Sequence, residues 1–144
     1  MSNSDTIKLL KECDAGSKMA VSSIDDILSK ADDKELILLL TESKNHHEKL
    51  GNDLHTLLLE YNSEEKEPNV MAKGMSKLRT NVKINMNDCD HTIADLMIDG
   101  CDMGIKSLYK YLNQYKTAND RSKELCKKII DIEYELRNKL YHFL

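Results

Sequence analysis

The sequence is short of the residues that interrupt helices. Its 144 residues include one proline, Pro68, five glycines and no tryptophan. Because proline and glycine are the residues least compatible with a helix interior, their scarcity favours long, uninterrupted helices. Four cysteines are present, but they show neither a Cys-x-x-Cys pair nor another zinc-finger spacing. We therefore expect reduced thiols packed in the core rather than a zinc finger.

Two further absences bear on location and partners. No apolar run approaches the roughly 18 residues that a membrane-spanning helix needs, and the first residues lack the basic and apolar segments of a signal peptide. Acidic and basic residues, 25 and 21 in number, are mixed along the chain and leave a net charge of −4, so no surface suits a phosphate backbone. We expect a cytoplasmic protein that binds neither membranes nor nucleic acid.

What the sequence does contain is a helical pattern of apolar residues. Hydrophobic residues make up 40% of the chain and recur at spacings of three and four, as in amphipathic helices. The pattern predicts a single all-α domain, residues 1–144, folded as a four-helix bundle. The expected helices span about residues 5–30, 33–62, 88–116 and 118–144.

Residues that favour helix N-termini precede three of these segments. Asp32, followed three residues later by Glu35, has the form of a capping box at the start of the second helix. Asn87 or Asp88 is expected to cap the third helix, and Thr117 the fourth. The turns before the second and fourth helices are short, so each is expected to close an antiparallel hairpin.

The segment between the second and third helices is much longer. The acidic stretch 63–67 and Pro68 come first, and residues 69–86 are predicted to form a connecting helix. About sixteen helical residues extend roughly 24 Å, which is enough to cross the bundle from end to end. We therefore expect two antiparallel hairpins joined by a long helical crossover, the ferritin-like arrangement, rather than a simple up-and-down bundle.

Polar residues interrupt the predicted apolar stripes near the middle of the helices. Counted from the turns at 31–32 and near 117, Asp14, His47, Cys101 and Glu133 each lie about 16 or 17 residues from their turn. The four side chains are therefore expected at one level inside the bundle. Such groups suit iron, manganese or zinc, so the set is a candidate metal site. The alternative is a metal-free polar layer in which Asp14 or Glu133 holds His47.

The order of these segments resembles that of the ferritin-like superfamily, in particular small bacterial rubrerythrin-like domains of unassigned function. The resemblance covers most of the chain. It includes Asp99-Gly100-Cys101-Asp102 followed by Tyr109 and Tyr111, which is similar to the Gly-Glu-Asp then Tyr pattern of such helices.

The resemblance also implies a lost activity. Catalytic members carry a glutamate on two helices and a Glu-x-x-His pair on the other two, which together hold two iron ions. In this chain Glu42 is followed by Asn45, and Glu133 by Leu136, at the positions of the histidines. We therefore expect a bundle whose di-iron oxidase chemistry has been lost.

Three functions are compatible with these observations. The first is a non-enzymatic binding or structural module, expected to form a homo-oligomer such as a dimer and to have a protein partner. The second is mononuclear metal binding or storage. The third is histidine phosphotransfer, because the run from His46 to Gly51 approaches the His-x-x-Lys-Gly sequence of such bundles, with the glycine displaced by one residue. No nucleophile stands beside a base at a recognisable spacing, so an ordinary enzyme is not expected.

Overall fold

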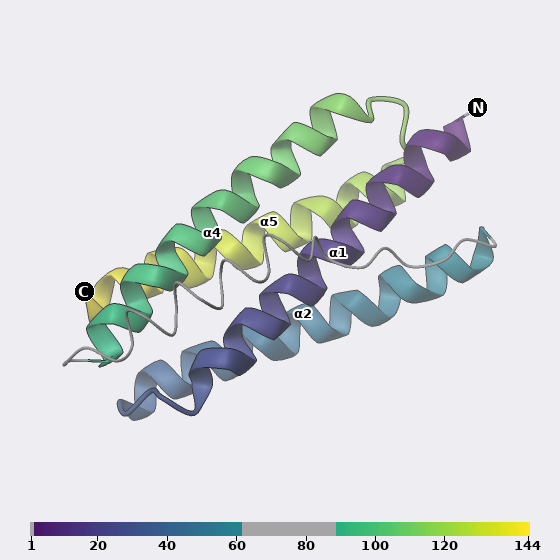
Figure 1. Ribbon diagram of the computed structural model, residues 1–144. Coiled ribbons are helices and arrows are strands. Elements are labelled where there is room, and N and C mark those ends of the chain that lie inside the picture. The colour runs from purple at the N-terminus through teal and green to yellow at the C-terminus, as the bar shows by residue number, and fades with distance from the viewer. Residues whose placement is uncertain (1, 62–88) are drawn as a thin grey trace.

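The computed structural model describes residues 2–61 and 89–144, and these ranges contain helices joined by short turns and no strand. The described residues form four long helices, followed by a short 3-10 helix: α1 (Ser2–Leu28), α2 (Lys34–Glu60), α4 (Cys89–Gln114), α5 (Asp120–Leu140) and η1 (Tyr141–Phe143). Figure 1 shows α1 and α2 as one antiparallel hairpin and α4 and α5 as the other, packed as a four-helix bundle. The predicted all-α four-helix bundle is confirmed.

The N-cap of α2 lies one residue later than predicted. Asp33, not Asp32, has the extended backbone of a cap, and its carboxylate accepts the N–H groups of Glu35 at 2.8 Å and Leu36 at 3.2 Å. These bonds satisfy two of the amide donors that the first turn of a helix leaves without an intrahelical partner. The expected capping box is therefore replaced by a simple aspartate cap.

The start of α5 also differs from the prediction. Asn119, rather than Thr117, is the N-cap, and its side-chain oxygen accepts the N–H of Ser122 at 2.9 Å. Thr117 lies in the preceding turn, where its own groups bond to another helix. α4 begins at Cys89. The caps predicted at 87 and 88 lie outside the described residues.

At one end of the bundle, the turn between α1 and α2 lies against the start of α4. The carboxylate of Asp90 accepts the N–H groups of Asp32 at 2.8 Å and Asp33 at 3.0 Å. Asp90 therefore satisfies two turn amides and fastens the first hairpin to the second.

At the opposite end of the bundle, residues of the first hairpin bind the turn of the second hairpin. The carboxylate of Asp5 accepts the N–H of Thr117 at 3.0 Å and its hydroxyl at 2.6 Å, and Thr6 accepts the N–H of Asn119 at 2.8 Å. The Asn119 amide also donates to the Tyr61 hydroxyl, at the end of α2. The end of α2 and the start of α4 thus lie at opposite ends of the bundle (Figure 1), as the predicted crossover requires. The helix predicted at 69–86 lies outside the described residues.

The apolar core is divided into two clusters. One, near the Asp5–Thr117 end, contains Leu9, Leu10, Cys13, Leu50, Leu54, Leu58, Ile105, Leu108, Ala118, Leu125, Cys126, Ile129 and Ile130. The other, near the Asp90 end, contains Ile24, Ile27, Ala31, Leu36, Leu40, Ile93, Ala94, Ile98, Cys101, Leu136 and Leu140. No helix in the described part of the chain is long and apolar enough to cross a membrane.

Candidate functional site

Buried polar residues lie between the two apolar clusters. On α1 they follow Cys13, on α2 they lie between Leu40 and Leu50, and on α5 they lie between Ile130 and Leu136. The members of this polar layer are Asp14, Ser17, Ser43, His47 and Glu133, all at most 8% exposed. The level at which the sequence predicts a polar interruption is therefore the level at which the core divides.

The centre of the polar layer is an ion pair between α2 and α5. Nε2 of His47 lies 2.7 Å from Oε1 of Glu133, and their side chains are 1% and 10% exposed. Of the two partners expected for His47, the structure shows Glu133. A buried carboxylate needs such a partner, because leaving its charge unpaired away from water is costly.

Cys101 lies on α4 beside this pair. Cys101 is 1% exposed. Burial, followed by the negative charge of Glu133, raises the pKa of the Cys101 thiol far above its ordinary value. A metal ligand must be a thiolate, so the surroundings of Cys101 oppose the form in which it could bind an ion.

Asp14 is buried at the same level but is directed along its own helix. Its Oδ2 lies 3.2 Å from Nζ of Lys18, four residues later on α1, and the Lys18 side chain is 33% exposed. No group of three or more histidine, cysteine, aspartate or glutamate residues within 2–61 and 89–144 is arranged to hold a metal ion. The structure therefore places Glu133 beside His47, Cys101 in the buried core of α4 and Asp14 beside Lys18, and the metal role of the set stays a prediction.

The polar layer contains several atoms that no protein group satisfies. Nδ1 of His47 and the hydroxyl oxygens of Ser17 and Ser43 are buried and have no hydrogen-bond partner among the described residues, and Nε2 of His47 is close to Glu133 without forming a well-aligned hydrogen bond. Buried polar groups are usually paired with protein atoms, water or an ion. These three atoms are the places where a small polar guest could be held.

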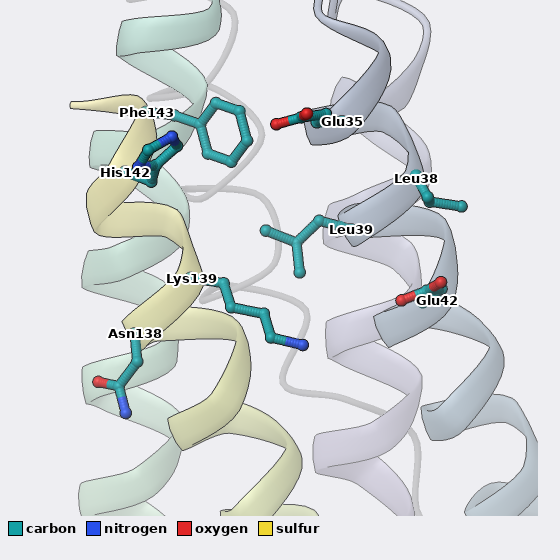
Figure 2. A pocket seen from close by; sticks show the side chains of 8 residues that line it. All are labelled: Glu35, Leu38, Leu39, Glu42, Asn138, Lys139, His142 and Phe143. Atoms are coloured by element: carbon teal, nitrogen blue, oxygen red, sulfur yellow. The ribbon is translucent and has the colours of Figure 1, made fainter.

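A second feature is a groove on the surface between α2 and α5, near the C-terminus. It has a volume of about 350 Å³ and is lined by Glu35, Leu38, Leu39, Glu42, Asn138, Lys139, His142 and Phe143. Figure 2 shows Leu39, Lys139 and Phe143 directed into the gap between the two helices, with Leu38 on the outer side of α2. The groove thus has an apolar centre and polar edges, as peptide-binding grooves do.

The sequence contains a signal for this groove that the predicted helix stripes do not include. Residues 36–40 read Leu-Ile-Leu-Leu-Leu, and five successive apolar residues cover every face of a helix. Leu36 and Leu40 are fully buried in the core, whereas Leu38 is 58% exposed. An apolar run that exceeds what one helix face can bury is typical of a surface that receives a partner.

The histidines proposed for phosphotransfer lie in different environments. His47 is buried in the polar layer, so a phosphodonor could not reach it in this conformation. His46 is exposed on α2 beside a small recess that also contains Glu135 and Lys139. The phosphotransfer interpretation is therefore left with His46 alone.

Comparisons with known proteins concern the fold only. No protein-family model matches the chain, and no curated protein matches its sequence significantly. Among solved structures it is similar to the crystal structure of a DUF305 fragment from Deinococcus radiodurans, with a TM-score of 0.75 over 96% of this chain and 93% of that one. The two are 10% identical, so the likeness extends to the helical fold and not to function. None of these comparisons links the chain to the ferritin-like superfamily.

Proposed function

We propose that this protein is a non-enzymatic binding module that holds an amphipathic helix of a partner protein in the groove between α2 and α5. The observation that carries the proposal is the combination of an apolar centre, formed by Leu39 and Phe143, with an exposed leucine, Leu38, at the outer edge of the α2 wall. Apolar side chains left at a groove of this size are the usual contacts for the apolar face of a helix.

The charges around the groove indicate the kind of helix it would bind. Glu35 and Glu42 lie seven residues apart on the α2 wall, which corresponds to about 10 Å, or two helical turns. On the opposite wall, Lys139 is already paired with Glu135 at 2.8 Å. A complementary helix would therefore carry two basic residues about two turns apart, with apolar side chains between them.

A synthetic helical peptide of that design provides the test. It would carry leucines on one face and arginines seven residues apart, and a peptide of the same composition in scrambled order would serve as control. We expect the designed peptide to bind the full chain in isothermal titration calorimetry, and the scrambled one to bind at least about tenfold more weakly, a difference of ~1.4 kcal/mol. Equal binding of both peptides would contradict the proposal.

Two leucines on α2 provide matched variants. Leu38 lines the groove and is 58% exposed, whereas Leu59 is 59% exposed near the far end of the same helix. Leu38→Lys removes an apolar contact and places a positive charge against the basic peptide, so it should weaken binding about tenfold or more. Leu59→Lys should leave binding unchanged. Similar losses in both variants would show that the groove is not the binding site.

A second copy of this chain is the competing occupant, because a homo-oligomer is also expected. Sedimentation velocity on the wild-type chain and on Leu38→Lys separates the two cases. A dimer that dissociates in Leu38→Lys would assign the groove to self-association instead of to a different protein. A species whose mass is the same in both preparations supports the partner interpretation.

Metal binding by Asp14, His47, Cys101 and Glu133 is the second candidate function. The observation in its favour is Nδ1 of His47, a buried nitrogen with no protein hydrogen-bond partner within the described residues. The experiment is elemental analysis of protein purified without a histidine tag, together with thermal unfolding in the presence of Mn²⁺, Fe²⁺ or Zn²⁺. Stoichiometric metal that is lost in His47→Ala would support this function, and metal-free protein whose unfolding temperature no ion raises would exclude it.

A further inference from the structure

A small recess continues the groove along the seam between α2 and α5. Leu39, Glu42 and Lys139 line both the groove and the recess, whereas Ser43 and Glu135 line the recess alone. The recess brings together one carboxylate from each helix, because Glu42 lies on α2 and Glu135 on α5. It is therefore an acidic extension of a groove whose centre is apolar.

The ammonium group of Lys139 reaches into this extension. Nζ of Lys139 donates to Oε1 of Glu135 at 2.8 Å, and Figure 2 shows the lysine side chain extending from α5 toward the α2 wall that carries Glu42. The hydrogen bond with Glu135, and the charges of Glu135 and Glu42, raise the pKa of Lys139. The Lys139 and Glu135 side chains are 54% and 60% exposed, and ion pairs as exposed as this are weak. Another cation can therefore displace Lys139 at little cost.

The recess also contains a buried polar atom without a protein partner. Ser43 is 5% exposed, and its hydroxyl oxygen forms no hydrogen bond within residues 2–61 and 89–144. With Lys139 in place the free volume of the recess is about 20 Å³, which is enough for about one water molecule. A larger polar group can reach Ser43 only after Lys139 has moved aside.

We propose that this recess is a guanidinium subsite, in which an arginine of the partner helix replaces Lys139. The inference rests on the groove being the binding site proposed above. A guanidinium group presents five N–H donors in a planar fork, whereas an ammonium group presents three donors on a single nitrogen. Glu42, Glu135 and Ser43 supply acceptors on both sides of the seam, which one fork can bridge. Lys139 is thus an internal competitor, and the subsite selects arginine over lysine.

The role of Lys139 is tested with two matched variants on α5. Lys139→Gln removes the competing charge, and Lys128→Gln removes an equal charge from another exposed position of the same helix. In isothermal titration calorimetry, the designed arginine peptide should bind Lys139→Gln about tenfold more tightly than Lys128→Gln, because both carboxylates are free before the peptide arrives. Equal affinities of the two variants would overturn the proposal.

The preference for arginine is tested with a second peptide in which lysines replace the arginines. The wild-type chain should bind the arginine peptide at least about fivefold more tightly than the lysine peptide. Glu135→Gln should abolish most of this preference, whereas Glu124→Gln, which removes an exposed carboxylate paired with Arg121 on the same helix, should keep it. Equal binding of both peptides to the wild-type chain, or a preference that survives Glu135→Gln, would contradict the subsite.

A small probe separates a failure of the subsite from a failure of the groove. N-acetyl-arginine methylamide is titrated into isotope-labelled Lys139→Gln and followed by NMR, with N-acetyl-lysine methylamide as control. We expect the arginine probe to shift the amides of Glu42, Ser43 and Glu135, and the lysine probe to shift them less. If the probe binds there while the helical peptide binds nowhere, the proposed function fails and the subsite stands. If the peptide binds but the probe leaves these amides unchanged, the subsite is refuted and the groove stands.

Discussion

His47 on α2 and Glu133 on α5 are joined across the centre of the bundle by an ion pair of 2.7 Å. The pair lies where the apolar core divides into two clusters, so it connects the two hairpins at the level where apolar packing between them is interrupted. A buried charge pair of this kind contributes little compared with apolar residues of the same volume, but it is costly to break from one side only.

Removing one partner should therefore destabilise the protein strongly. Glu133→Ala or His47→Ala is expected to lower the free energy of unfolding by about 3–5 kcal/mol, because the remaining group loses its partner while still buried. Denaturant unfolding followed by circular dichroism measures this. The matched control is Glu135→Ala, which breaks an exposed pair with Lys139 and should cost at most about 0.5 kcal/mol.

The double variant His47→Leu with Glu133→Leu extends this prediction. Because neither buried charge remains, its stability should exceed that of either single alanine variant. If Glu133→Ala and Glu135→Ala had equally small effects, the His47–Glu133 pair would have no structural role.

Asp90, whose carboxylate joins the start of α4 to the turn between α1 and α2, should contribute more to the free energy of unfolding than an ordinary surface aspartate. Asp90→Ala leaves the N–H groups of Asp32 and Asp33 without their carboxylate acceptor, and we expect a loss of about 1–2 kcal/mol. Hydrogen exchange at those two amides should accelerate. In Asp53→Ala, an exposed substitution on α2, the change should stay within about 0.5 kcal/mol. If the hydrogen exchange rates of the amides of residues 32 and 33 did not change, Asp90 would not hold this turn in solution.

The hydrogen bonds between Thr117 and the Asp5 carboxylate predict that the stability of the fold falls in acid. The hydroxyl and then the amide of Thr117 donate to the Asp5 carboxylate and lower its pKa from 3.8 in the folded protein. Because the folded-state pKa is the lower one, this contribution is fully present above the unfolded value and is lost as the pH falls through the folded value. Asp5→Asn should weaken the fold at neutral pH and flatten its stability below about pH 5. Carbon-detected NMR titration of the Asp5 carboxyl tests the direction, and a pKa at or above 3.8 would refute it.

Thiol reactivity should differ sharply between two cysteines of α4. Cys89 is half-buried, whereas Cys101 is buried beside Glu133, and both burial and that carboxylate raise its pKa. Iodoacetamide should therefore label Cys89 in the folded protein and leave Cys101 unmodified until denaturant is added. Rapid native labelling of Cys101 would show that its site opens readily or lies in a different environment.

The sequence was sufficient to predict the bundle and the level of its polar layer. The helical rise is constant, so counting residues from each turn placed His47 beside Glu133 even though they are far apart in the chain. Counting could not give side-chain direction. Asp14 turns toward Lys18, one helical turn away, because that pair forms within α1 and lets the lysine reach solvent.

The hydrogen bonds that join the two hairpins at the ends of the bundle could not be predicted by the same reasoning. Asp90 bonds to an amide 58 positions earlier in the chain, and Asp5 to a threonine 112 positions later. Periodicity reports which face of a helix is buried but not which turn it meets, and a single sequence offers no other long-range information. For the same reason Thr117 reads as a helix cap when its partner is in fact Asp5.

The most direct test of the proposed docking groove is an NMR titration of the isotope-labelled full chain with the designed arginine-bearing peptide. Amide shifts are expected to change along residues 35–42 of α2 and along residues 138–143, which cover the end of α5 and η1, and to stay constant around Leu59. Shift changes centred on any other face of the bundle, or none at peptide concentrations that saturate calorimetric binding, would contradict the assignment of the groove as the binding site.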